Sequence, residues 1–363
     1  MTSPIAMLID FGQSPWYDNL SRSLLRDGGL QRLIDDDGIR GVTSNPTIFE
    51  KAIANGEGYD EQLVACSREG RSIEDTYWEL VLDDVASAAG LLAPVHRRVG
   101  TDGFVSVEVS PDLAHDTDRT KAQVQEFFSR LDRPNVMVKI PATLEGLPAI
   151  RDSIAAGINV NVTLIFSLER HAAVIEAYLT GVERLVEQGG DPSKVHSVAS
   201  FFVSRVDTET DRRLPEDSPL RGKAAVANAK LAYRLFRQTF AGARWDPLAG
   251  QGANLQRPLW ASTSTKNPAY SPTLYIDELI GRDTVNTLAP ASIEALHEGK
   301  ATLRPDTVEA DVDGAAQVMR DLAAAGVDFD DVTDTLEREG VAAFSTSFHD
   351  ALKTLEKRRA EVS

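Results

Sequence analysis

Short apolar stretches rich in β-branched residues alternate along the chain with longer amphipathic stretches of helical period, and this alternation predicts a parallel α/β fold. We expect eight strands, at Pro15–Asn19, Gly41–Ser44, Gly103–Glu108, Val136–Ile140, Gly157–Thr163, Val195–Phe202, Pro258–Ser262 and Asp283–Thr287. Helices are expected between them, at Leu20–Ile34, Ser72–Val99, Arg119–Asp132, Leu144–Ala156, Leu168–Gln188 and Ala224–Phe240.

Eight strands separated by helices favour closure into a (β/α)8 TIM barrel, with an open doubly wound sheet as the alternative. The nearest approach to a dinucleotide-binding turn is Gly250-Gln-Gly252, a bare Gly-x-Gly in a loop far from the first strand. We expect a single domain over residues 1–363, with a barrel core at about 15–300 and a helical tail at about 306–363.

The two ends of the chain lie outside the expected barrel. Residues 1–13 lack the basic and apolar regions of a secretory signal, so we expect a short arm before the first strand. The tail is expected to form helices at Asp313–Ala325, Phe329–Glu339 and Val341–Arg359. Because their apolar faces need cover, they should pack on the barrel or form a subunit contact.

Lys139 ends a strand that is otherwise hydrophobic. Side chains alternate in direction along a strand, so Met137 and Lys139 should share one face while Val136, Val138 and Ile140 share the other. Other strands also have polar residues near their ends, each on the same face as the residue two positions before it, and the ends of parallel barrel strands meet at one pole. These sets are Trp16 with Asp18, Thr43 with Asn45, Ser106 with Glu108, Asn159 with Asn161 and Thr163, Val198 with Ser200, and Ser262 with Ser264. One polar strand end is ordinary capping, but the set favours an active site.

A lysine amine is a poor nucleophile while it is protonated, but burial in an apolar barrel mouth disfavours the charged form. A neutral Lys139 could then attack a ketone and form an imine. Asp18 and Glu108 are candidates for the accompanying proton transfer. Lys139 could instead be a structural ion-pair partner of either carboxylate. Neutral groups that could hold sugar hydroxyls or a water come from other strand ends, namely Asn45, Asn161, Thr163 and Ser200. Arg205 and Lys266 are candidates for a phosphate clamp, although each alone could be a surface charge.

Composition limits the partners. The net charge of −17 makes nucleic acid an unfavourable partner, and no apolar run is long enough for a transmembrane helix. The single cysteine, Cys66, fits a reducing cytoplasm and should be a structural thiol. Monomer and homodimer both stay open.

Several segments resemble the transaldolase family, a group of Schiff-base aldolases, and the resemblance runs from about Pro15 to Asn286. Gly41-Val-Thr-Ser-Asn-Pro-Thr-Ile-Phe49 is similar to the first signature of that family, and Asn135-Val-Met-Val-Lys-Ile-Pro-Ala-Thr143 to the second. The segments at residues 157–166 and 197–205 resemble further family blocks, and the start at residues 14–20 looks like the longer bacterial subgroup.

The resemblance implies an enzyme that transfers a dihydroxyacetone unit from fructose 6-phosphate or sedoheptulose 7-phosphate to an aldose phosphate, in the pentose phosphate pathway. It implies that Lys139 forms the imine, Asp18 moves the proton at the cleaved bond, and Glu108 and Thr163 position a water. Asn45, Asn161 and Ser200 would hold the three-carbon unit. Arg205 would bind phosphate, with Lys266 as the second contact. No metal or organic cofactor is expected.

Three other functions stay open at this point. An aldolase on the same barrel would release free dihydroxyacetone instead of transferring it. A non-catalytic barrel would bind sugar phosphates as a sensor or scaffold. A metal-dependent aldolase is disfavoured, because the histidines form no ligand motif such as His-Glu-x-x-His. They are His96, His115, His171, His196, His297 and His349.

Overall fold

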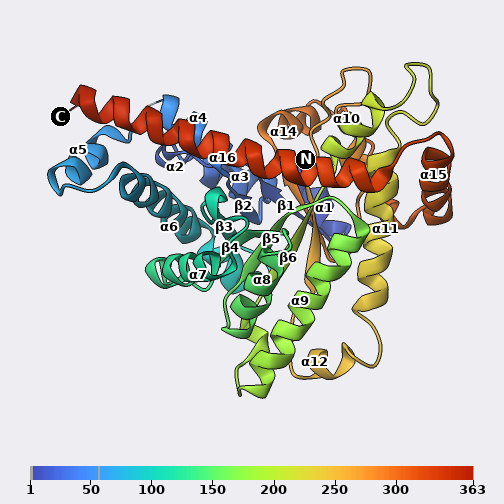
Figure 1. Ribbon diagram of the computed structural model, residues 1–363, viewed down its shortest axis with the longest axis horizontal. Coiled ribbons are helices and arrows are strands. Elements are labelled where there is room, and N and C mark those ends of the chain that lie inside the picture. Colours follow the sequence, from blue (N-terminus) through green and yellow to red (C-terminus); the bar gives the residue numbers. More distant parts are fainter. Residues whose placement is uncertain (1–2, 56–57, 363) are drawn as a thin grey trace.

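A computed structural model describes residues 3–55 and 58–362, and in it eight parallel strands close into a barrel in which each strand pairs with the next along the chain (Figure 1). The last strand pairs with the first, so the barrel has no open edge. The strands are β1 (Gln13–Tyr17), β2 (Gly41–Thr43), β3 (Phe104–Glu108), β4 (Val136–Pro141), β5 (Val160–Ile165), β6 (Ser197–Phe202), β7 (Gln256–Ala261) and β8 (Thr284–Leu288). Each overlaps a predicted strand, which confirms the TIM barrel.

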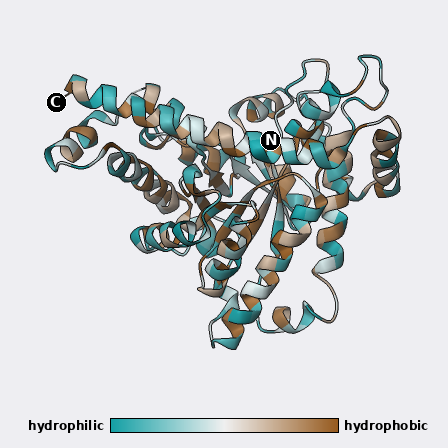
Figure 2. Ribbon diagram, in the orientation of Figure 1, coloured by the Kyte–Doolittle hydropathy of each residue, from teal (hydrophilic) through white to brown (hydrophobic). Residues whose placement is uncertain are grey.

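Helices surround the barrel, and each contains both hydrophobic and hydrophilic residues (Figure 2). The longer ones are α3 (Gly29–Asp37), α4 (Pro46–Asn55), α5 (Asp60–Arg68), α6 (Ile73–Val99), α7 (Thr117–Leu131), α8 (Gly146–Ala155), α9 (Leu168–Glu187), α10 (Ser204–Arg212), α11 (Ala224–Thr239) and α14 (Pro290–His297). Shorter ones are α2 (Arg22–Arg26), α12 (Asp246–Gly250) and α13 (Leu274–Glu278). No helix of the described residues is both long and apolar enough to cross a membrane.

Three helical predictions were wrong in detail. The stretch Leu20–Ile34 forms two helices, because Gly28 takes a left-handed conformation with φ of 68° between them. The Pro, Gly and Asn residues of Trp245–Arg257 predict a loop there, but this segment contains α12. The expected arm before β1 forms helix α1 (Pro4–Asp10), whose first turn is capped by Ser3 and contains Pro4. Residues 1 and 2 of that arm lie outside the described residues.

The tail forms two helices, α15 (Val312–Ala324) and α16 (Phe329–Val362), where three were predicted. We expected a break at Gly340, but α16 continues through it. A Cβ atom at Gly340 would lie 3.0 Å from Cδ2 of Leu164, so the missing side chain lets the helix approach β5 closely. In Figure 1, α16 runs across the barrel on the same side as α4 and α10, and it packs on both.

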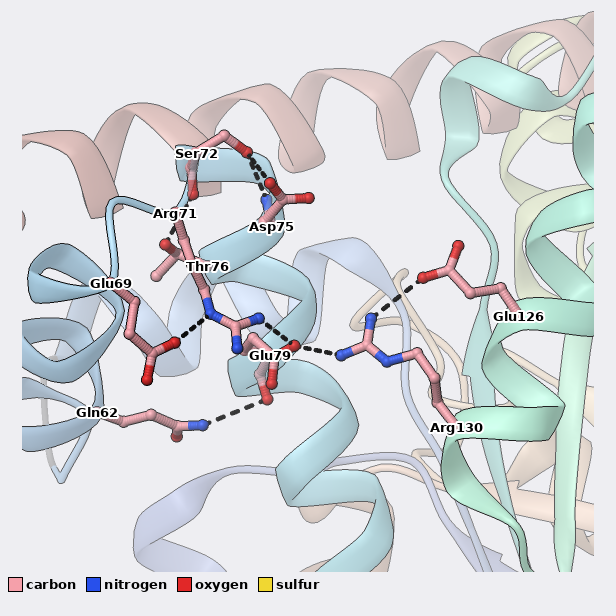
Figure 3. Close-up of polar contacts among 9 residues, drawn as sticks. All are labelled: Gln62, Glu69, Arg71, Ser72, Asp75, Thr76, Glu79, Glu126 and Arg130. Atoms are coloured by element: carbon pink, nitrogen blue, oxygen red, sulfur yellow. Dashed lines mark hydrogen bonds and ion pairs between the residues drawn. The ribbon is translucent and has the colours of Figure 1, made fainter.

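A surface network ties α5, α6 and α7 together (Figure 3). The Arg71 guanidinium pairs with Glu69 and Glu79, each at 2.7 Å, and Glu79 also pairs with Arg130 of α7. The far end of α16 joins this network, since Arg359 Nη1 donates to the Arg71 carbonyl oxygen at 3.0 Å. Exposed ion pairs each contribute about 0–1 kcal/mol, so the network fixes orientation more than stability.

The barrel interior contains two cavities, one at each pole. Met137 lines the cavity at the amino-terminal pole and Lys139 lines the one at the carboxyl-terminal pole, so both side chains point inward, as the strand alternation predicted. The amino-terminal pole is held by the buried carboxylate of Asp102, which pairs with Arg257 at 2.9 Å and Arg40 at 3.5 Å. The residues predicted to be catalytic lie at the opposite, carboxyl-terminal pole, around the cavity that contains Lys139.

Candidate active site

A cavity of about 270 Å³ opens at the carboxyl ends of the strands. Every residue predicted for the site lines it except two, and those two, Glu108 and Asn161, contact residues that do. The predicted residues in its wall are Asp18, Asn45, Lys139, Thr163, Ser200, Arg205 and Lys266. Since they come from positions spread between residues 18 and 266, the barrel topology is what brings them together.

Lys139 lies at the centre of this group. Its side chain is only 6% exposed, and its Nζ is 3.0 Å from Oε2 of Glu108. The ammonium also donates to the main-chain carbonyl oxygen of Ser44 at 3.0 Å. In the sheet register, Lys139 is flanked by Glu108 on β3 and Asn161 on β5. A buried charge is costly unless it is paired, so these neighbours are what allow an amine at this depth.

Two carboxyl groups adjoin the lysine in different surroundings. Burial raises the pKa of Glu108, although the neighbouring Lys139 ammonium opposes that rise. Burial also raises the pKa of Asp18, opposed by the hydrogen bond that Thr43 Oγ1 donates to its Oδ1 at 2.7 Å. The pKa values of both carboxyl groups are therefore shifted toward neutral pH, the direction that favours proton transfer at that pH.

A chain of neutral hydrogen bonds covers the other side of Lys139. The Ser200 hydroxyl donates to Oδ1 of Asn161 at 2.7 Å, and Nδ2 of Asn161 donates to the Ser106 hydroxyl at 2.9 Å. The buried hydroxyl of Thr163 has no hydrogen-bond partner among the described side chains and main-chain groups. A buried hydroxyl in that state is available to a substrate or a water.

The two cations predicted to bind phosphate, Arg205 and Lys266, also line the cavity. Arg205 is in the first turn of α10, with its Cζ 5.5 Å from the centre of the Phe202 ring. Burial lowers the pKa of Arg205, although Glu339 and Glu108 oppose that change. Lys266 is exposed on the loop after β7. A guanidinium and an ammonium in one wall can hold an anionic group.

Asn45 and Ser264 differ from their predicted setting, because β2 ends at Thr43 and β7 at Ala261. Asn45 still faces the cavity, but its Oδ1 accepts a hydrogen bond from the Ile48 amide at 3.0 Å, so it also caps the start of α4. Ser262 takes a left-handed φ of 57°, which ends the alternation expected beyond it. Ser264 accordingly lies outside the cavity wall and bonds to Ser292 at 2.9 Å.

Several groups in the site were not predicted from the sequence. Phe344 of α16 lines the cavity, although it is only 4% exposed and lies far along the chain from the barrel. Ser347 of the same helix bonds to Thr47 of α4 at 2.8 Å, which holds the helix over the cavity. Lys51 of α4 and the Ser44 carbonyl were also not anticipated. The apolar pattern of an amphipathic helix does not show which of its residues line a substrate cavity and which pack in the core.

Cys66 is buried in α5, and burial raises the pKa of its thiol, which favours the structural role expected for it. Among the described residues, no group of three His, Cys, Asp or Glu side chains is arranged to hold a metal ion. The expectation that neither metal nor cofactor takes part stays a prediction.

Comparison with known proteins gives a consistent result. Residues 15–355 match the family model described as Transaldolase/Fructose-6-phosphate aldolase. The chain is 48% identical over 359 residues to a protein named Transaldolase from Saccharopolyspora erythraea, covering 98% of both chains. It is 48% identical over 366 residues to the Transaldolase of Thermobifida fusca, covering 99% of both, and 47% identical to that of Mycobacterium leprae, covering 99% of this chain and 97% of the relative.

Proposed function

The chain is an enzyme of the Transaldolase/Fructose-6-phosphate aldolase family, and from this premise we propose that Lys139 carries a three-carbon ketose fragment between sugar phosphates as an imine. The donor would be fructose 6-phosphate or sedoheptulose 7-phosphate and the acceptor an aldose phosphate, as in the cytoplasmic pentose phosphate pathway. The observation that carries the proposal is the buried Lys139 amine, which faces the cavity 3.0 Å from Glu108.

In the proposed first half-reaction, the Lys139 ammonium gives its proton to Glu108, which lies 3.0 Å away, and the neutral amine attacks the ketose carbonyl carbon to form a carbinolamine. Glu108 then returns the proton to the carbinolamine hydroxyl, which leaves as water and gives a protonated imine. Asp18 accepts the proton of the hydroxyl next to the bond that breaks. The electron pair of that bond moves into the imine, which becomes an enamine, and an aldose phosphate leaves. Glu108 and Thr163 would orient the water that is released in imine formation and consumed in imine hydrolysis. Glu108 lies 3.0 Å from Lys139, and Thr163 lines the same cavity as Lys139.

The second half-reaction reverses these steps with another aldehyde. The enamine carbon attacks the acceptor carbonyl, Asp18 returns its proton to the new hydroxyl, and water hydrolyses the imine to free the lysine. Asn161 and Ser200, linked by their 2.7 Å hydrogen bond, would hold the hydroxyls of the retained fragment, together with Asn45. Arg205 and Lys266 would hold the phosphate of either sugar.

Borohydride reduction in the presence of fructose 6-phosphate tests the proposal. It should fix a three-carbon adduct on Lys139, located by mass spectrometry of proteolytic peptides. Lys139→Met should form none, whereas Lys51→Met, which changes another lysine of the same cavity wall, should still form the adduct on Lys139. An adduct on a different residue, or none in the unchanged protein, would refute the imine mechanism.

The family model also includes fructose-6-phosphate aldolases, so release of free dihydroxyacetone is the second candidate function. The relatives named Transaldolase favour transfer. The two differ in whether water protonates the enamine before an acceptor arrives. Measuring free dihydroxyacetone with and without erythrose 4-phosphate separates them, because a transferase releases little dihydroxyacetone in either case.

A further inference from the structure

The loop that carries Lys266 connects β7 to α13 and spans residues 262–273. Its two sides are joined by a hydrogen bond from Thr265 Oγ1 to the Ser271 carbonyl oxygen at 2.8 Å. Lys266 is exposed near the tip and forms no ion pair with any described residue. Its position in the cavity wall is therefore set by how the loop is anchored.

Helix α10 anchors the loop at both ends. At the start of the loop, the Ser262 carbonyl oxygen accepts a hydrogen bond from the Ser204 amide at 3.1 Å, and the hydroxyls of these two residues are 2.9 Å apart. Near its end, the Tyr270 hydroxyl donates to Oδ2 of Asp211 at 2.6 Å. Asp211 is in the last turn of α10, and Ser204 begins that helix.

Both partners of the Tyr270–Asp211 hydrogen bond are also held by contacts with Gly222. A Cβ atom at Gly222 would lie 2.7 Å from Cζ of Tyr270, so the ring packs directly on a main chain that has no side chain there. The other carboxylate oxygen of Asp211 accepts a hydrogen bond from the Gly222 amide at 2.9 Å. Burial raises the pKa of Tyr270 to about 12, so its hydroxyl is protonated and donates at neutral pH.

The same helix carries Arg205 in its first turn. Arg205 and Asp211 are six residues apart in sequence, which is roughly 9 Å along a helix that rises about 1.5 Å per residue. A short helix does not change its length, so fixing the loop to Asp211 also fixes Lys266 relative to Arg205.

We propose that Tyr270 is a positioning residue for the phosphate end of the substrate, because its hydrogen bond to Asp211 sets the spacing of Arg205 and Lys266. The inference rests on the proposed function, since it assigns the phosphate to those two cations. Tyr270 itself lines a neighbouring cavity and not the one that contains Lys139. It therefore acts through the loop and not on the reacting atoms.

Tyr270→Phe removes the hydrogen bond and keeps the ring on Gly222. We expect KM for fructose 6-phosphate to rise roughly three- to tenfold, the size expected for one hydrogen bond, with kcat little changed. The Kd of inorganic phosphate, measured by phosphorus NMR, should rise by the same factor. Tyr275→Phe is the matched control, because its hydroxyl donates to Asp207 of the same helix at 2.8 Å and Tyr275 lies beyond the loop. It should leave both constants unchanged.

A second comparison separates positioning from a general loss of stability. In a Lys266→Met background, Tyr270→Phe should have little further effect on phosphate binding, because the cation that it positions is absent. Additive effects, an unchanged phosphate Kd in Tyr270→Phe, or no phosphate binding by the unchanged protein would each overturn the inference. The NMR measurement needs no turnover, so failure of the imine mechanism appears separately, as a missing adduct on Lys139.

Discussion

Replacing Lys139 with methionine should make the stability of the protein depend on pH in a defined direction. The substitution removes the ammonium that lies 3.0 Å from Glu108 and leaves a carboxyl group that is only 5% exposed. Burial already raises the pKa of Glu108, and the opposing effect of Lys139 would be lost. The folded variant should therefore bind a proton at Glu108 that the unfolded chain does not bind at neutral pH.

The magnitude follows from the cost of protonating an ordinary glutamate. With an unfolded pKa of about 4.3, neutralisation at pH 7 costs about 3.7 kcal/mol, falling to about 1 kcal/mol at pH 5. A carboxyl whose folded pKa is raised lowers stability as pH rises from the unfolded value through the folded one. We therefore expect the stability deficit of Lys139→Met relative to the unchanged protein to shrink by up to about 2.7 kcal/mol between pH 7 and pH 5.

Urea denaturation of both proteins at the two pH values measures the deficit. The double variant Lys139→Met/Glu108→Gln is the control, because it removes the stranded carboxyl and should be more stable than Lys139→Met at pH 7. A deficit that is the same at pH 5 and pH 7, together with a double variant no more stable than the single one, would refute the reasoning. It would mean that the site admits enough water to solvate the carboxylate.

Three further predictions concern catalysis. Arg205→Ala should raise KM for fructose 6-phosphate by roughly 10- to 100-fold, the size of a lost charged hydrogen bond, while sparing an unphosphorylated donor; equal effects on both donors would contradict the phosphate role. Phe344→Ala and Phe348→Ala should each cost about 3–5 kcal/mol in chemical denaturation, since both rings are buried, but only Phe344→Ala should change KM, because only Phe344 lines the cavity. Burial raises the pKa of both Asp18 and Glu108, and both carboxyl groups must be ionised to accept a proton. On the acid side, kcat/KM should therefore fall at a pH above the ordinary carboxyl range of about 3.9–4.3. A pH profile that falls only within or below that range would argue against these roles.

The strands and the inward direction of Lys139 were predictable, because strand alternation and polar strand ends are local signals. Asp18, Glu108 and Thr163 were found by the same reasoning, and the barrel then places them around one cavity. Ser264 shows where that reasoning stops. β7 ends at Ala261, three residues before it, and that far beyond a strand end the direction of a side chain depends on the turn and no longer on strand alternation.

The contribution of the tail could not be predicted in the same way. Phe344 belongs to an amphipathic helix. Such a pattern predicts that the apolar face of the helix is buried, but not which part of the protein it packs against. At Gly340, α16 also passes close to Leu164, a contact between residues distant in sequence that a local pattern does not record. The anchoring of the Lys266 loop by Tyr270 and Asp211 is likewise a long-range contact that no local pattern records.

The position of α16 has a consequence for the order in which this protein becomes competent during synthesis. A ribosome finishes β8 at Leu288, and with it every strand of the barrel, well before it adds Phe344. A nascent chain at that stage already contains Lys139, both carboxyl groups, Arg205 and Lys266, but it lacks Phe344 of the cavity wall. Under the proposed imine mechanism, we expect the bound sugar fragment to be fully shielded from water only after α16 has been translated, which would link activity to completion of the polypeptide.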